Sequence, residues 1–272
     1  MTMSLEPMMA ANAAVFAIKN ATTEGKITVI VLLLLSLFSW TIILSKFRQL
    51  LIAQNAAKKF FAAYASTRDP LDIKKRGEDF DGAPAYELYE RGADELDYQL
   101  QKNPVTVKGE RRISPSSFEA VKVVLEEAAA AQAMSLEKGM IVLSTAVAGG
   151  PFIGLLGTVW GVMSTFASIA ENNSASLTTM APGVAAALVA TVTGLLVAIP
   201  AMFAYNFMVT TVRAITQELD GFATRYATQI EHVYVDNRPL AEEIKSANEA
   251  LAGRIVEGLK ADESRFQNTP AI

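Results

Sequence analysis

The sequence predicts an all-α membrane protein in which three helices cross the bilayer and the second and third form a hairpin. Residues 27–45 are uncharged and mostly apolar, and Glu171 is the only charged residue between Lys138 and Arg213. That long stretch consists of two apolar halves, 139–170 and 180–207, on either side of the polar break ENNSASLTT. Each half exceeds the roughly 20 residues that a helix needs to cross the hydrocarbon core. The break, at 171–179, is too short to hold a domain.

The first predicted span, ITVIVLLLLSLFSWTIILS at 27–45, follows an N-terminal segment of residues 1–26. It is rich in Leu and Ile and contains no Gly. A helix of this kind suits contact with lipid, so we expect it to lie outside the hairpin. Trp40 lies near its basic end, where the aromatic belt of membrane proteins is found.

Residues 46–138 form a predicted soluble insert of helical character, in which basic and acidic residues balance. Helical periodicity continues into it from the first span. Turn signals then follow at Asp69–Pro70, Asp81–Gly82 and Asn103–Pro104. The insert contains no glycine-rich phosphate loop and no nucleophile elbow, so the sequence assigns it no chemistry.

The last helix of the insert is predicted to start at Ser114–Pro115, because Pro is favoured in the first helical turn. Ser116 and Glu119 have the spacing of a capping box. We expect this helix to run directly into the second span, which makes that span long and extends it beyond the membrane. A kink is expected at Gly149–Pro151, where Gly and Pro weaken a helix.

Small residues recur at helical spacing in both halves of the predicted hairpin. Residues three or four apart share a helix face, and small side chains let helix backbones approach closely, which is the main way in which helices associate in lipid. We therefore expect both helices to be surrounded by other helices. The predicted packing residues are Gly150, Gly154, Gly157 and Gly161 in the second span and Ala187 and Gly194 in the third.

Beyond the third span, residues 208–272 are predicted to form C-terminal helices and a tail. Apolar residues recur every three or four positions from Val209 to Val233, which indicates an amphipathic helix that projects from the membrane. Asp236–Pro239 is expected to end it. A shorter helix then follows from Leu240 to Ile255, and the last residues are expected to be disordered.

Basic residues at the ends of the spans predict the orientation. Lys46, Arg48, Lys138 and Arg213 all flank the spans on one side, whereas the break at 171–179 contains no Lys or Arg. Because basic flanks favour the cytoplasm, we expect the insert and the C-terminal region there. The N-terminal segment and the break are then on the outer side.

Two hydroxyls stand out in the apolar hairpin, those of Thr158 and Thr191. Thr158 lies twelve residues before Ala170, and Thr191 lies twelve after Thr179. At about 1.5 Å of rise per residue, both lie roughly 18 Å from the turn, near the middle of the bilayer. Thr hydroxyls in membranes also bond back to carbonyls of their own helix. A packing role and a hydroxyl-lined path both fit this spacing.

The composition argues against several classes of function. The net charge is −4 and no basic stripe occurs, which argues against nucleic-acid binding. The chain has no Cys, so it has neither disulfides nor thiolate ligands, and the single histidine, His232, cannot form a histidine metal site alone. No metal and no other cofactor is predicted.

Two motifs in the hairpin resemble a known family. The run GLLGTVWGVM at 154–163, followed by APGVAAALVATVTGLLVAIPAMFAYN at 181–206, is similar to the MotA/TolQ/ExbB proton-channel family, and most similar to its TolQ and ExbB branch. The order of three spans with a large insert after the first also matches. The insert and the tail resemble the family only in their helical character.

The resemblance implies a homo-oligomeric ring in the bacterial inner membrane, typically of five copies, around the helices of an ExbD/TolR-like partner with one span. The outer side of the membrane is then the periplasm. Ion flow down the proton-motive force would drive motion that energises TonB-dependent transport or Tol–Pal envelope maintenance, through a TonB- or TolA-like protein. The pore-lining threonines of the family correspond to Thr158 and Thr191.

One position departs from the family pattern. Many TolQ and ExbB sequences have Glu four residues after the proline of the PG motif, where this chain has Ala186. A membrane-embedded carboxylate normally marks a proton relay, and this hairpin has none except Glu171 at its outer end. The resemblance then implies that the partner supplies an Asp. Whether Na⁺ replaces H⁺ is left open.

Two other classes of function compete with an ion channel. An intramembrane hydrolase would need a base or a metal to activate Ser144, Ser164 or Ser168, and no His, Asp or Lys lies in a span. A structural scaffold that does not conduct would use the same small-residue packing, so the sequence does not exclude it.

Overall fold

The computed structural model describes residues 23–107, 109–172 and 176–236. In the tail it describes residues 244, 245, 248, 251, 252, 255 and 256. Most of the predicted N-terminal segment, the middle of the polar break and most of the C-terminal tail therefore lie outside the described residues.

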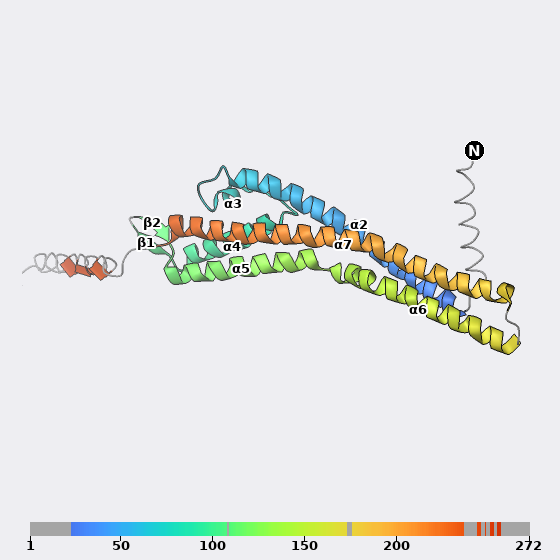
Figure 1. The fold of residues 1–272 in the computed structure, drawn as a ribbon. Coiled ribbons are helices and arrows are strands. Elements are labelled where there is room, and N and C mark those ends of the chain that lie inside the picture. Colours follow the sequence, from blue (N-terminus) through green and yellow to red (C-terminus); the bar gives the residue numbers. More distant parts are fainter. Residues whose placement is uncertain are drawn as a thin grey trace, which may run out of the picture.

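Three long helices form the frame of the molecule (Figure 1): α2 (Thr23–Tyr64), α6 (Met140–Asn172) and α7 (Leu177–Tyr234). Each is long and apolar enough to cross a membrane. At 1.5 Å per residue α2 rises about 63 Å and α7 about 87 Å, whereas the hydrocarbon core is about 30 Å thick. Both helices are therefore far longer than one crossing requires, and their far parts pack with the rest of the chain into a body that comprises residues 46–107, 109–138 and 208–236.

Helix α2 lies beside the antiparallel pair α6 and α7 and packs against both. Its inward face buries Thr28, Leu32 and Ser39. Its outward face exposes large apolar side chains: Leu33, Leu34, Leu37, Phe38 and Leu44. This division places α2 outside the hairpin with one face available to lipid.

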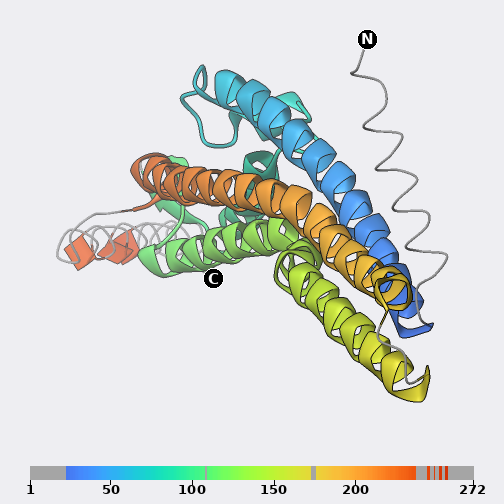
Figure 2. The same cartoon turned by 45° about the vertical axis from the view of Figure 1, so that its right-hand side comes forward.

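The path from α5 (Pro115–Glu137) into α6 is broken. Gly139 has φ = +85°, a left-handed conformation that only glycine adopts without steric penalty. The prediction of a continuous helix kinked at Gly149–Pro151 is therefore wrong, because the break lies at Lys138–Gly139 and α6 continues through Pro151. Figure 2 shows that α5 and α6 run in different directions on the two sides of this break.

The start of α5 also differs from the prediction. Ser114 is the capping residue, and its hydroxyl oxygen accepts a hydrogen bond from the backbone N–H of Ser117 at 3.1 Å. Pro115 occupies the first helical turn. The predicted capping box of Ser116 and Glu119 is wrong, since Glu119 instead forms an ion pair with Lys122 at 2.7 Å.

The body between α2 and α5 contains α3 (Asp72–Arg76), α4 (Pro84–Lys102) and an antiparallel hairpin of β1 (Val105–Val107) and β2 (Glu110–Arg112). The three predicted turns separate α2, α3, α4 and β1, and are confirmed. The small hairpin corrects the purely helical expectation. Just after β2, Ile113 pairs with Val235, which fixes the end of α7 to the body.

Aromatic side chains form the core of the body where α2, α4 and α7 meet. The Phe60 and Phe222 rings lie 5.4 Å apart and almost perpendicular, and Tyr64 lies 5.1 Å from Phe222. Tyr89 and Tyr226 are also fully buried, with ring centroids 5.1 Å apart. Such ring pairs contribute about 0.5 to 1.5 kcal/mol each beyond their buried area.

The loop between α2 and α3 is held by polar side chains of α7. The Tyr226 hydroxyl donates to the carbonyl of Pro70 at 3.2 Å, and Tyr234 donates to Asp69 Oδ1 at 2.7 Å. Partial burial alone raises the pKa of Asp69, but hydrogen bonds from Lys75, the Leu71 N–H and Tyr234 outweigh it and lower that pKa below its usual value. The ionised carboxylate of Asp69 therefore stabilises this loop.

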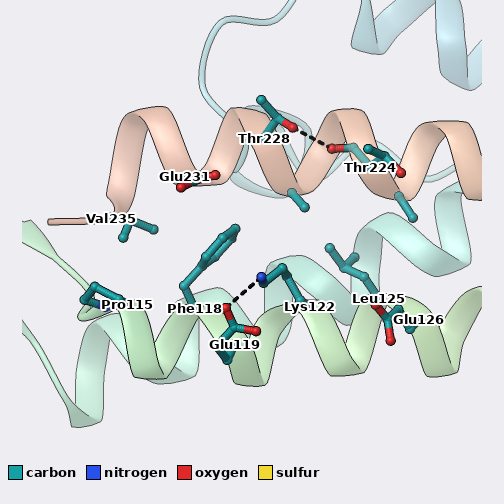
Figure 3. A pocket seen from close by; sticks show the side chains of 12 residues that line it. Pro115, Phe118, Glu119, Lys122, Leu125, Glu126, Thr224, Thr228, Glu231 and Val235 are labelled. Atoms are coloured by element: carbon teal, nitrogen blue, oxygen red, sulfur yellow. Dashed lines mark hydrogen bonds and ion pairs between the residues drawn. The ribbon is translucent and has the colours of Figure 1, made fainter. Parts of the chain in front are cut away.

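A cavity of about 330 Å³ lies between α5 and α7 in the body (Figure 3). Phe118 and Leu125 line its apolar part, and the ion pair of Glu119 and Lys122 lies beside them. It is far along both helices from the membrane hairpin.

Candidate functional site in the membrane hairpin

Four of the five glycines of α6, all except Gly149, face neighbouring helices at very short range. A Cβ atom placed on Gly150 would lie 3.1 Å from the carbonyl oxygen of Gly194, and one placed on Gly154 would lie 3.1 Å from that of Ala190. A Cβ on Gly161 would lie 2.7 Å from the Cβ of Ala187. The two backbones of the hairpin are thus in direct contact, which side chains larger than hydrogen at these positions would prevent.

The first span reaches this contact at Gly157. A Cβ there would lie 2.5 Å from the Ala190 Cβ and 3.0 Å from the Thr28 methyl carbon. Thr28 is 3% exposed, and its hydroxyl donates to the carbonyl of Glu24. All three spans therefore meet at one level of the hairpin, between Gly154 and Gly161.

Thr191 connects the two hairpin helices. Its hydroxyl donates across the helix pair to the carbonyl oxygen of Gly154 at 3.1 Å. The missing side chain of Gly154 makes room for this contact, since the Thr191 Cα lies only 3.1 Å from the position that a Cβ would take. The side chain is half-buried.

Thr158 bonds within its own helix. Its hydroxyl donates to the carbonyl of Leu155 at 2.6 Å, and the side chain is also half-buried. Gly154 contacts Thr191 and Gly161 contacts Ala187, so Thr158 lies between these two levels. Four residues rise about 6 Å, which puts the two threonines within roughly one helical turn of each other in height. Among the hydrogen bonds of the described residues, none joins their hydroxyls.

Thr165 of α6 is a further hydroxyl at the contact between the hairpin helices, and the sequence reasoning missed it. It is 6% exposed and donates to the carbonyl of Gly161 at 2.8 Å. A Cβ on Gly183 would lie 2.2 Å from its oxygen, so Thr165 fills the space opposite that glycine. The signal was present, because Thr165 lies seven residues after Thr158 and hence on nearly the same helix face.

Ala186 is half-buried and lies beside Ala187, which packs on Gly161. No carboxylate accompanies the threonines, because Glu171 near the end of α6 is the only charged residue from 139 to 212. The described residues also contain no group of three or more His, Cys, Asp or Glu side chains that could hold a metal ion.

The hydroxyl chemistry of this region is limited and specific. Thr158 and Thr191 each donate their hydrogen to a carbonyl, which leaves the oxygen lone pairs for a water molecule or a cation. A threonine hydroxyl does not titrate near neutral pH, so these groups can solvate an ion but cannot relay a proton by ionising.

The fold and this site define a class: a multi-pass helical membrane protein whose closely packed hairpin carries hydroxyls in an otherwise apolar interior. Residues 95–221 match the MotA/TolQ/ExbB proton channel family. Together with the relatives described next, this match shows that the chain belongs to that family. Members of this family are transport subunits and not enzymes.

Relatives from both branches align with this chain. It is 34% identical over 190 residues to the Biopolymer transport protein ExbB of Pseudomonas putida, across 69% of this chain and 54% of that protein. It is 31% identical over 213 residues to the Tol-Pal system protein TolQ of Haemophilus influenzae, across 77% of this chain and 90% of that one. The TolQ of Pseudomonas aeruginosa is 30% identical over 191 residues, across 70% and 80%. The match thus spans about half of the first protein and most of the other two.

Proposed function

We propose that this chain is the channel subunit of a stator-type complex that couples the proton-motive force to mechanical work on the cell envelope. Membership of the proton channel family supports this function. The observation that carries it for this chain is the Thr191 hydroxyl, which bridges to Gly154 where three closely packed spans meet. Thr158 and Thr191 line the ion pathway in this proposal.

The complex contains several copies of the chain, five as the family resemblance implies, arranged as a ring in the inner membrane. Large apolar side chains cover the outward faces of the hairpin, among them Phe152, Val159, Phe166, Leu188 and Phe203. Neighbouring copies and lipid provide the apolar surroundings that these faces need. Gly150, Gly154, Gly157, Gly161, Ala187 and Gly194 set the close helix packing within each copy, on which the ring depends.

A second protein of the ExbD/TolR type supplies the ionisable group. A proton path through the bilayer needs an acid that can gain and lose a proton, and Ala186 occupies the position at which the family resemblance implies Glu. A single-span partner with an Asp beside the threonines would complete the path. Since hydroxyls and carbonyls also coordinate Na⁺, the carried ion is H⁺ or Na⁺.

The insert and the C-terminal region lie in the cytoplasm in this proposal, and the N-terminal segment and hairpin turn lie in the periplasm. The basic residues at the span junctions support this orientation. The work delivered is TonB-dependent transport or Tol–Pal maintenance, through a TonB- or TolA-like protein. The relatives described above include both an ExbB and a TolQ, at 34% and 31% identity, so the alignments favour neither branch.

The proposal is tested by ion flux in vesicles that contain the chain and its single-span partner. Proton entry is followed with an internal pH dye under an imposed membrane potential, with and without Na⁺. We expect flux in the native complex and its loss in Thr158→Val and Thr191→Val. Thr193→Val is the matched control, because Thr193 bonds only to Val189 of its own helix and lies outside the proposed pathway.

The competing function is a scaffold of the same architecture that does not conduct. The direct backbone contacts of the hairpin fit it equally well. A native complex that assembles with its partner but passes neither H⁺ nor Na⁺ would support the scaffold and contradict the channel. Normal flux in both threonine variants would show that their hydroxyls serve packing.

A further inference from the structure

Three routes cross the boundary between the hairpin and the extramembrane body, and only one of them is interrupted. Helices α2 and α7 are continuous across it, whereas the route from α5 to α6 breaks at Lys138–Gly139. The left-handed conformation of Gly139 interrupts the helical path and makes a joint there. Without a further restraint, the direction of α6 relative to α5 would depend on packing alone.

Lys46 of α2 lies at this joint. It is only 8% exposed, and its ammonium donates three hydrogen bonds: to the carbonyls of Ser135 (3.2 Å) and Leu136 (3.1 Å) and to Gln49 Oε1 (2.8 Å). Its aliphatic stem passes Gly139, since a Cβ there would lie 3.9 Å from the Lys46 Cε. One side chain therefore contacts both the end of α5 and the joint.

These contacts match what the end of a helix requires. The last four carbonyls of a helix have no partner within it, and Ser135 and Leu136 belong to the last turn of α5. A positive charge at this end also interacts favourably with the helix dipole. Lys46 thus supplies from a different helix, 90 residues away in sequence, the positive charge that the last turn of α5 lacks.

Stability of the fold alone does not explain why the Lys46 ammonium is buried at this position. Burial, and secondarily repulsion by Lys138, lower the pKa of the Lys46 ammonium. The protonated form is therefore disfavoured at this position relative to water, and an apolar side chain of similar length would fill the space without that penalty. A buried charge that is satisfied only in one arrangement restricts the chain to that arrangement.

We propose that Lys46 is a positioning residue that fixes the angle between α5 and α6, so that the extramembrane body and the hairpin move as one unit. The part of this inference that concerns ion flow rests on the proposed channel function. The part that concerns the angle does not, and it is tested separately.

The angle is measured by electron spin resonance on spin labels at Val123→Cys in α5 and Phe152→Cys in α6. Both side chains are exposed, and the chain has no Cys of its own, so labelling is specific. Labelled chains are diluted with unlabelled ones so that only distances within one copy contribute. We expect one narrow distance distribution in the native protein and a broadened or shifted one in Lys46→Met.

Lys138→Met is the matched control, because it removes an exposed charge from the same junction without touching the α5 carbonyls. It is expected to leave the distribution narrow, as is Lys46→Arg, which keeps the charge and the donors. If Lys46→Met does not insert, Lys46→Gln carries the same expectation. An unchanged distribution in the Met or Gln variant, or equal broadening in Lys138→Met, overturns the proposal.

Ion flux, measured in the same preparations, tests the part of the proposal that concerns ion flow. We expect a several-fold loss of flux in Lys46→Met with the mass of the native complex unchanged, and no loss in Lys138→Met. If the native complex itself does not conduct, the channel function fails while the distance measurement still decides the role of Lys46. A broadened distance distribution together with full ion flux would overturn the link between Lys46 and conduction.

Discussion

The hydroxyl of Thr191 lies 3.1 Å from the carbonyl oxygen of Gly154, so a side chain of α7 bonds directly to the backbone of α6. Thr158, the other threonine of the proposed pathway, bonds only to Leu155 of its own helix. The two residues therefore differ in what their hydroxyls do for the fold, even if both serve ion passage.

This difference predicts that the Thr191→Val and Thr158→Val variants differ in their free energy of unfolding. Loss of the bond between helices is expected to destabilise the hairpin by about 0.6 to 1.7 kcal/mol, whereas Thr158→Val is expected to change the free energy of unfolding little. Reversible unfolding in mixed micelles measures both, with Thr193→Val as the control. Equal effects of the three variants would contradict the structural role assigned to Thr191.

The direct backbone contact of the hairpin predicts that Gly194→Ala is poorly tolerated. A Cβ on Gly194 would lie 2.5 Å from the carbonyl oxygen of Gly150, so the helices must separate. We expect a destabilisation of about 1 to 3 kcal/mol, as for other overpacked sites. In the matched control Gly149→Ala, the new Cβ meets only the Ile153 side chain at 4.0 Å. Equal melting temperatures for the two variants would contradict the contact.

The missing carboxylate predicts a gain of pH dependence in Ala186→Glu. A glutamate at this half-buried position would add a titrating group to the pathway. We expect the dependence of ion flux on pH to acquire a new transition. Ala186→Gln, which has the same shape without the acid, should show none. Identical pH profiles for the Glu and Gln variants would place residue 186 away from the path.

The lowered pKa of Asp69 predicts that the loop between α2 and α3 loses stability at acidic pH. Its pKa is lowered in the folded protein, so its contribution to stability is fully present above the unfolded value, about 3.9, and is lost as the pH falls through the folded pKa. Limited proteolysis of residues 65–71 should therefore accelerate below about pH 4. Asp69→Asn should be cleaved faster at neutral pH and should lack this acidic transition. A loop equally resistant in both proteins would show that the carboxylate charge of Asp69 does not stabilise it.

Hydropathy and small-residue spacing were sufficient to predict the three long apolar helices, because lipid forces a spanning backbone to satisfy its own hydrogen bonds. The same constraint explains the misplaced break. Gly149–Pro151 contains stronger helix breakers than Gly139, yet α6 stays helical there while packed against Gly194 and Ala198. The chain breaks instead at Gly139, where Lys46 can bond to the carbonyls that the end of α5 leaves without a partner in the helix.

The depth of the two candidate threonines in the membrane could be predicted from the sequence, but their contacts could not. Equal distances from the turn placed Thr158 and Thr191 close in height, and the structure puts them within about one turn. Depth says nothing about rotation around the helix axis, so the sequence could not show that only Thr191 points at the other helix. The β-hairpin was missed for a related reason. Its turn depends on the left-handed Gly109 inside a charged segment whose strands have only three residues each.

Helix α7 is a single rod from the hairpin turn to the far tip of the body, where Val235 pairs with Ile113. Because its 58 residues rise about 87 Å, a tilt of only about 3° about its membrane end would sweep the opposite end sideways by roughly 4 to 5 Å. Such a lever turns a shift of about 1 Å beside Thr191 into a displacement as wide as a side chain at the opposite end. A force applied at the distant tip would, in turn, displace the part of α7 that lies in the bilayer.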